Sequence, residues 1–153
     1  MHKVKAKILY LPHYDREWGD MKYAYEGDSG FDIRACMEAD FELAPGERCS
    51  IPVGFRVQLE PGFGWTFRSR SGCSKIGLVV TAGLGTIDSG YNGEPVANMV
   101  NHSNEPISIT RGMRIAQGVI EPIYQADFVE IANEGEFDER ERGARGFASS
   151  GMK

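Results

Sequence analysis

The sequence of 153 residues is poor in the residues that bind metals or form disulfides, with three cysteines and three histidines. Cys36, Cys49 and Cys73 show no Cys-x-x-Cys spacing, and the histidines are scattered along the chain. This composition provides no zinc-site pattern. We therefore expect three reduced thiols that act as packing residues in a cytoplasmic protein.

Long apolar runs are also absent. No stretch approaches the roughly 20 residues that span a bilayer. The basic start, residues 1–7, is not followed by the apolar region of a signal peptide. The formal net charge of -5 repels phosphate backbones and anionic lipids. We therefore expect that this chain is neither a membrane protein nor a secreted precursor, and that it does not bind nucleic acid. A small polyanion held by a local arginine cluster remains compatible with this charge.

A convincing helical stripe is missing too, and the pattern of the chain is that of strands. Residues 51–59 alternate between apolar and other residues with a period of two, and 107–109 and 119–123 add shorter apolar pieces. The 19 glycines predict many turns between short strands. A short helical turn fits at most within 69–78. This pattern predicts an all-β sandwich or barrel.

The C-terminal region differs in composition from the rest. Residues 134–141 are mainly acidic, and 142–151 are rich in glycine and serine. Composition alone favours a disordered, solubilising tail. The alternative is an arm that grips phosphate and becomes ordered on binding. Phe147 favours the arm, because this segment offers an aromatic ring no local core to join.

Two internal segments carry candidate chemistry. Arg70-Ser71-Gly72 follows an apolar strand and combines a forked cation, a hydroxyl and a backbone N–H that phosphate can approach. By itself, this segment is more simply a surface turn. Residues 83–93 predict a β-hairpin with a polar tip at Asn92-Gly93. In it, Asp88 is a turn-stabilising residue or a carboxylate that orients a water, and Tyr91 is a packing residue or a flat wall beneath a ring.

Taken in order, these segments resemble the five motifs of the trimeric dUTPase family, the deoxyuridine triphosphate pyrophosphatases. The corresponding residues are 29–35, 70–72, 85–93, 112–117 and 142–151. The resemblance implies a jelly-roll-like β subunit, with the main domain over 1–133 and an acidic linker with a glycine- and serine-rich arm over 134–153. It also implies a homotrimer in which three subunits share each active site and the arm orders over a neighbour's pocket.

The reaction implied by the resemblance is hydrolysis of dUTP to dUMP and pyrophosphate, with Mg²⁺ carried on the triphosphate. This reaction lowers dUTP and supplies dUMP for thymidylate synthesis. Phosphoryl transfer depends on positioning and charge neutralisation, which arginines, amides, Mg²⁺ and one oriented water can provide. No direct protein ligand to the metal is expected, although Asp32 corresponds to an acid linked to the water shell of the metal.

The family roles carry over residue by residue. Asp88 would orient the attacking water and hold the 3′-hydroxyl, and the Tyr91 ring would leave no room for a ribose 2′-hydroxyl. Main-chain groups at Ala82, Thr86, Ile87 and Val96 would read uracil. The phosphates would be bound by Arg70, Ser71, Gly72 and Gln117. In the arm, Arg142, Gly146, Ser149 and Ser150 would grip the γ-phosphate, while Phe147 stacks on uracil.

The arm and the third motif depart from the family in places. Arg145 and Ala148 stand where glycines are usual, and Gly90 replaces a common acidic residue. A side chain at 145 or 148 would strain a left-handed backbone, although Arg145 could instead add a phosphate contact. Ala82 replaces an asparagine found in some relatives, and only a main-chain contact to uracil would survive that change.

Two other functions compete with dUTP hydrolysis. dCTP deaminase has a related fold, but the glutamate that moves its protons aligns with Asn98, and an amide cannot do this. The other alternative is a regulatory trimer of reduced activity that binds a protein partner. The aromatic-rich segment 13–27 is a covered loop, a subunit contact or a partner site, and the first of these is the simplest interpretation.

Overall fold

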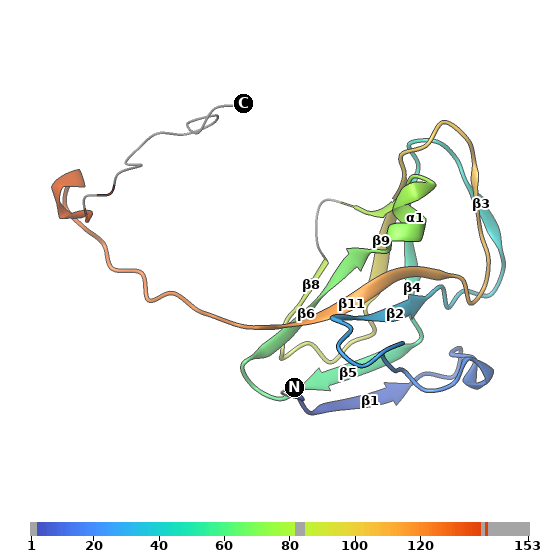
Figure 1. Cartoon of the computed structure of the whole chain (residues 1–153), viewed down its shortest axis with the longest axis horizontal. Helices are drawn as coiled ribbons and strands as arrows, with labels where there is room; N and C mark the ends of the chain where they lie inside the picture. The colour runs from blue at the N-terminus through green and yellow to red at the C-terminus, as the bar shows by residue number, and fades with distance from the viewer. Residues whose placement is uncertain (1–2, 82–84, 139, 141–153) are drawn as a thin grey trace.

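The computed structural model describes residues 3–81, 85–138 and 140, and strands dominate this part of the chain (Figure 1). The strands are β1 (Ala6–Tyr10), β2 (Gly30–Arg34), β3 (Phe41–Leu43), β4 (Arg48–Pro52), β5 (Phe55–Leu59), β6 (Phe63–Ser69), β7 (Leu78–Val80), β8 (Gly85–Ile87), β9 (Val96–Asn101), β10 (Ile107–Ile109) and β11 (Arg114–Pro122). The helical elements are α1 (Ser71–Lys75), η1 (Arg16–Trp18) and η2 (Glu134–Glu136). The all-β prediction is confirmed, and α1 lies within the window in which a short helical turn was expected.

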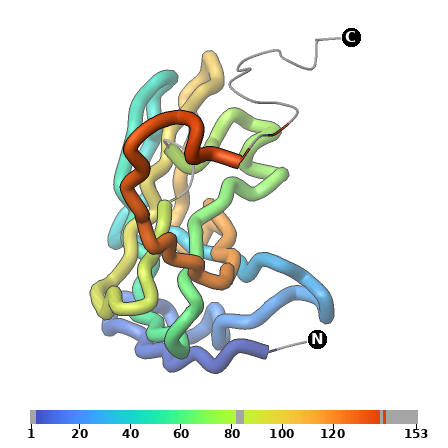
Figure 2. Tube along the Cα trace, turned by 90° about the vertical axis from the view of Figure 1, so that its left-hand side faces the viewer, coloured from blue at the N-terminus to red at the C-terminus, as the bar shows by residue number. Residues whose placement is uncertain are grey.

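Within the described residues, the strands pair antiparallel in four small sheets. The largest has the order β2-β11-β6-β8, the next β4-β9-β7, and the pairs β1-β5 and β10-β3 complete the set. After β11, the chain extends away from the sheets in Figure 1, and Figure 2 looks along this extension from its far end. None of the helices in the described segments is both long and apolar enough to cross a membrane.

The alternating segment 51–59 forms parts of two strands. β4 ends at Pro52 and β5 begins at Phe55, with Gly54 between them at a φ of 76°. A Cβ at Gly54 would lie 2.4 Å from the Cys36 Sγ, so this turn needs glycine for both backbone and space. β5 then pairs with β1 while β4 pairs with β9. The alternation continues across the turn because Val53 and Phe55 are both buried.

Aromatic side chains fill the centre of the core. The Trp65 ring lies 4.8 Å from the Phe67 ring, 5.7 Å from the Phe31 ring and 6.3 Å from the Phe55 ring, measured between centroids. Aromatic neighbours at such distances stabilise a core beyond their buried area alone. Because Phe31 and Ile33 of β2 point into this core, the alternation of the strand turns Asp32 to the opposite face.

The cysteines contribute to packing as free thiols. Cys36 and Cys73 are buried and Cys49 is half-buried, and no pair forms a disulfide. Burial raises the pKa of all three thiols, because the thiolate is poorly solvated inside the protein. They therefore stay protonated at neutral pH. These states agree with the three reduced packing residues that the sequence predicts.

A buried asparagine joins three segments of the fold. Asn101 is fully buried, and its Nδ2 donates to the carbonyls of Leu43 (2.9 Å) and Glu105 (2.8 Å). Its Oδ1 accepts from the N–H (2.8 Å) and hydroxyl (2.7 Å) of Ser103. We expect Asn101→Leu to lower the free energy of unfolding by about 3 kcal/mol, because it leaves these buried groups unpaired. Urea denaturation measures the loss, with Asn98→Leu, at an exposed position on the same strand, as a control that costs much less.

Candidate active site

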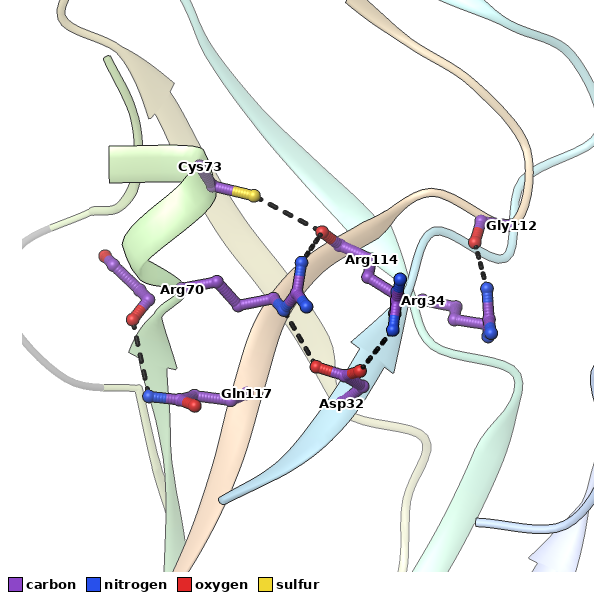
Figure 3. A network of polar contacts seen from close by, with 8 residues as sticks. Asp32, Arg34, Arg70, Cys73, Gly112, Arg114 and Gln117 are labelled. Atoms are coloured by element: carbon purple, nitrogen blue, oxygen red, sulfur yellow. Dashed lines mark hydrogen bonds and ion pairs between the residues drawn. The ribbon is translucent and has the colours of Figure 1, made fainter. Parts of the chain in front are cut away.

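A carboxylate shared by two arginines occupies the outer face of the largest sheet (Figure 3). The Asp32 Oδ1 accepts from the Arg70 Nε at 2.8 Å, and its Oδ2 accepts from an Arg114 guanidinium nitrogen at 3.1 Å. Arg70 also donates to the carbonyl of Arg114 at 3.2 Å. Two guanidinium groups on one carboxylate leave this cluster with an excess positive charge. Such a cluster is suited to an anionic ligand.

The strand register explains how residues distant in sequence reach this cluster. Gln117 of β11 lies opposite Asp32 on β2 and opposite Arg68 on β6. Directly opposite residues share a face of the sheet, so these three form a row. Arg68 does not join Asp32 but pairs with Glu121. Arg70 comes two residues later and reaches Asp32 from the end of β6, as Figure 3 shows.

The segment Arg70-Ser71-Gly72 leads into α1 beside this cluster. Arg70 is the N-cap residue with an extended backbone, and its side chain makes no capping hydrogen bond. Ser71 and Gly72 are exposed, and a Cβ at Gly72 would meet nothing within 4 Å. The first N–H groups of a helix have no partner within the helix and favour negative charge. Cation, hydroxyl and backbone N–H groups therefore lie together at this point, and their role in binding phosphate stays a prediction.

Gln117, the remaining predicted phosphate ligand among the described residues, is half-buried beside this segment. Its Nε2 donates to the carbonyl of Ser69 at 3.5 Å. Its side chain lies across Gly30 of β2, where a Cβ would approach the Gln117 Oε1 to 2.8 Å. The absence of a side chain at Gly30 thus leaves room for this amide. Gln117 lies opposite Asp32 in the register of β2 and β11 and so shares a face of the sheet with it.

The second group of predicted residues lies on and after β8. Asp88 follows this strand, and its carbonyl accepts from the Tyr91 N–H at 3.0 Å, which closes a turn. Thr86, Asp88, Tyr91 and Val96 are exposed, and Ile87 is half-buried. The hairpin predicted here is wrong, because β8 pairs with β6 whereas β9 pairs with β4 and β7. The loop over 88–95 therefore crosses from one sheet to another.

The two groups lie at opposite ends of β6. Ile87 pairs with Trp65 near the start of this strand, so Asp88 lies beside Gly64, whereas Arg70 follows the end of the strand. Strand geometry puts about 20 Å between Gly64 and Arg70. Among the described residues, no hydrogen bond or ion pair connects the loop over 88–95 to the Asp32 cluster.

Several predicted residues lie outside the described residues. These are Ala82, Arg142, Gly146, Phe147, Ser149 and Ser150. The departures at Arg145 and Ala148 lie there as well. The expected roles of all these positions stay predictions.

Three residues around the site were not singled out from the sequence. Arg114 completes the Asp32 cluster, although it stands within the fourth motif. The Glu94 carboxylate holds the loop over 88–95 against the body through His13 and Gly54. His13 and Glu94 are 81 positions apart, so no local pattern could pair them. For Arg114, its place in the fourth motif was the available signal, whereas its contact with Asp32 depends on the pairing of β2 with β11.

The described residues do not contain a metal-binding cluster of three or more histidine, cysteine or acidic side chains. Both oxygens of Asp32 accept from arginines, which is unlike a direct ligand of a hard cation. A hard cation bound here would therefore need oxygen ligands other than these two carboxylate oxygens.

Comparison with known proteins identifies the family. The dUTPase family model matches residues 16–151. The deoxyuridine 5′-triphosphate nucleotidohydrolase of Rhizobium rhizogenes is 43% identical over 85% of this chain and 83% of its own length. That of Pseudomonas entomophila is 39% identical over 100% of both chains. The solved dUTPase of Staphylococcus bacteriophage 80alpha (G164S mutant with dUpNHpp) has a TM-score of 0.81 at 26% identity, covering 97% of this chain and 99% of that one. The protein has the jelly-roll-like β fold of these enzymes, and the chain belongs to the dUTPase family, whose members hydrolyse dUTP.

Proposed function

We propose that this protein hydrolyses dUTP to dUMP and pyrophosphate in the cytoplasm, lowering dUTP and supplying dUMP for thymidylate synthesis. The observation that carries the proposal is the Asp32 cluster with its excess positive charge beside the start of α1. It provides charged donors and a serine hydroxyl for a phosphate chain. The family match and the neighbour solved with the dUTP analogue dUpNHpp support dUTP as the substrate.

Asp88 is the proposed base. Its side chain is exposed and makes no hydrogen bond within the part of the chain that the structure describes, so it is available to a water and to the 3′-hydroxyl. The oriented water forms a bond to the α-phosphorus and gives a proton to the Asp88 carboxylate. The bond between the α- and β-phosphates breaks, and pyrophosphate leaves. Positioning supplies much of the rate in such reactions, with little covalent chemistry from the protein.

Tyr91 and the neighbouring main chain are proposed to bind the nucleoside. Tyr91 is 44% exposed, so part of the residue is accessible to a deoxyribose. Main-chain groups at Thr86, Ile87 and Val96, with Ala82, would read uracil. Arg70, Ser71, Gly72 and Gln117 would bind the phosphates. When Mg²⁺ is bound on the triphosphate, it neutralises charge on the leaving pyrophosphate, and Asp32 would face its water shell.

The separation along β6 supports an assembly in which subunits share their sites, and we propose that this assembly is a homotrimer. About 20 Å of strand between the Asp88 and Arg70 positions is too far for both groups of one chain to act at the same phosphate bond. Complete sites would therefore combine the loop over 88–95 of one subunit with the Asp32 cluster of another. Exposed apolar side chains beyond β11 support an assembly, because they would be covered in it. They are Tyr124, Phe128, Val129 and Phe137.

The division of the chain is part of the same proposal. Residues 1–133 would form the jelly-roll domain, and 134–153 would be the acidic linker and arm. Through Arg142, Gly146, Ser149 and Ser150, the arm would grip the γ-phosphate of a neighbouring site while Phe147 covers uracil. Such an arm would order only when the site is filled.

Product analysis with purified protein tests the reaction. We expect pyrophosphate release with Mg²⁺ from dUTP, giving dUMP, and at least about 100-fold lower kcat/KM for UTP, dCTP and dTTP. Ammonia released from dCTP would instead indicate deamination. That outcome is not expected, because the amide of Asn98, which bonds the Ser50 hydroxyl at 2.6 Å, cannot accept a proton as a carboxylate does.

A regulatory role is the second candidate function. The dUTPase of Staphylococcus bacteriophage 80alpha is 28% identical over 97% of this chain, and phage dUTPases are reported to control the transfer of virulence genes. A folded protein without turnover of any of the four nucleotides would favour this candidate. Turnover of dUTP alone would favour the enzyme.

A further inference from the structure

One carboxylate anchors the loop that carries Asp88 and Tyr91. The Glu94 Oε1 accepts from the backbone N–H of Gly54 at 2.7 Å and contacts the His13 Nε2 at 2.8 Å. The His13 Nε2 can donate to this carboxylate in the tautomer that carries its hydrogen on that nitrogen. The Glu94 side chain is 23% exposed. It is therefore held at the surface of the body and does not extend freely into solvent.

Both partners of Glu94 belong to a firmly held part of the fold. Gly54 forms the turn between β4 and β5, with its carbonyl accepting from Leu11 at 2.8 Å. Gly54 also packs so closely beside Cys36 that no Cβ would fit there. The His13 carbonyl in turn accepts from Arg111 at 3.0 Å. Glu94 thus ties the loop to the turn after β4 and to the segment after β1.

Tyr91 depends directly on the position of Glu94. The Tyr91 hydroxyl donates to the Glu94 carbonyl at 3.0 Å. The ring lies over Gly93, where a Cβ would come within 2.4 Å of the Tyr91 hydroxyl oxygen. The Tyr91 ring therefore packs against the main chain of its own loop. Its orientation follows the Glu94 backbone, which the Glu94 side chain holds in place.

We propose that Glu94 is a positioning residue that sets the orientation of the Tyr91 ring and thereby the rejection of ribonucleotides, with His13 as its supporting partner. The inference rests on the proposed function, in which the Tyr91 ring lies against the sugar. A flat ring discriminates against one added hydroxyl only if its distance from C2′ is fixed, because a loose ring moves aside. Glu94 supplies this constraint from outside the substrate contacts.

The test compares kcat/KM for dUTP with that for UTP in wild type and three variants. Glu94→Ala is expected to lower the dUTP-to-UTP ratio roughly tenfold, mainly because UTP turns over faster. Glu94→Gln retains an oxygen that accepts from Gly54 and is expected to keep the wild-type ratio. Glu47→Ala is the matched control, because Glu47 also accepts from a backbone N–H, that of Ala44 at 2.8 Å, in a different turn. The Glu47 variant is expected to leave the ratio unchanged.

The outcomes separate this inference from the proposed function. An unchanged ratio in a folded Glu94→Ala protein overturns the role of Glu94, as does an equal loss in Glu94→Gln. If Glu94→Ala does not fold, Glu94→Asp decides the matter, because its shorter side chain loses reach while keeping charge, and an unchanged ratio there overturns the role. A wild-type protein that hydrolyses dUTP but accepts UTP equally well also refutes the inference and leaves dUTP hydrolysis standing. A wild type without dUTP turnover refutes the proposed function itself.

Discussion

Asp88→Asn is expected to lower kcat for dUTP hydrolysis by roughly 10³-fold while leaving nucleotide binding nearly unchanged. The asparagine oxygen can still accept a hydrogen bond from a sugar hydroxyl, but the amide cannot take a proton from water. The exposed position of Asp88 predicts no loss of fold. Steady-state kinetics gives kcat, and calorimetric titration with dUpNHpp gives the dissociation constant.

The matched control for this variant is Asp20→Asn. Asp20 is an exposed aspartate that pairs with Arg16 at 2.7 Å, outside every group assigned to the site. Exposed pairs of this kind contribute little to stability, and turnover should remain at the wild-type level. Near-normal turnover in Asp88→Asn would remove Asp88 from the mechanism. Loss of dUpNHpp binding in that variant would instead assign it mainly to substrate binding.

Mixing two inactive variants is expected to restore activity. Asp88→Asn and Arg70→Ala damage groups at opposite ends of β6, which we propose to meet only between subunits. When the two proteins are unfolded in urea, combined and refolded together, random assembly leaves roughly a quarter of the sites with both groups intact. Each variant refolded alone should stay inactive. The rate of dUMP formation by the mixture measures the recovery.

A second mixture serves as the control for shared sites. Asp88→Asn and Tyr91→Ala alter the same loop, so no chain in their mixture carries an intact loop. This mixture should show no recovery. If the first mixture also fails to recover while wild type refolds to full activity, Asp88 and Arg70 do not combine across subunits, and the proposed arrangement of the trimer is wrong.

The sequence predicts the kind of fold better than its connections. Alternating apolar residues report which side chains are buried, and this is why the all-β class and the buried residues Val53 and Phe55 agree with the structure. The same pattern does not report which strands pair. The bend at Gly54 and the crossing of the loop over 88–95 both depend on hydrogen bonds to distant strands, so the alternation over 51–59 did not indicate the bend, and the hairpin was predicted wrongly.

The same difference holds for the site: residues in short motifs could be named from the sequence, whereas partners that depend on contacts across the fold could not. The short motif at Arg70-Ser71-Gly72 lies beside Asp32 and Gln117 in the structure, whereas the roles that the family resemblance gives these residues stay predictions. Arg114 as a second partner of Asp32, and Glu94 as an anchor, depend on contacts across the fold. Such contacts arise from strand register and turn geometry, which residue types alone do not specify.

The loop over 88–95 starts from one sheet and ends in another. The packing between those sheets therefore contributes to the stability of the fold and also sets the relative position of the two ends of the loop. A conservative replacement in the interior, for example at Met99 of β9, would shift one end of the loop relative to the other without altering any residue near substrate. Catalytic performance and thermal resistance are then not independent traits. Selection for either one in this protein would change the other through the same interior positions.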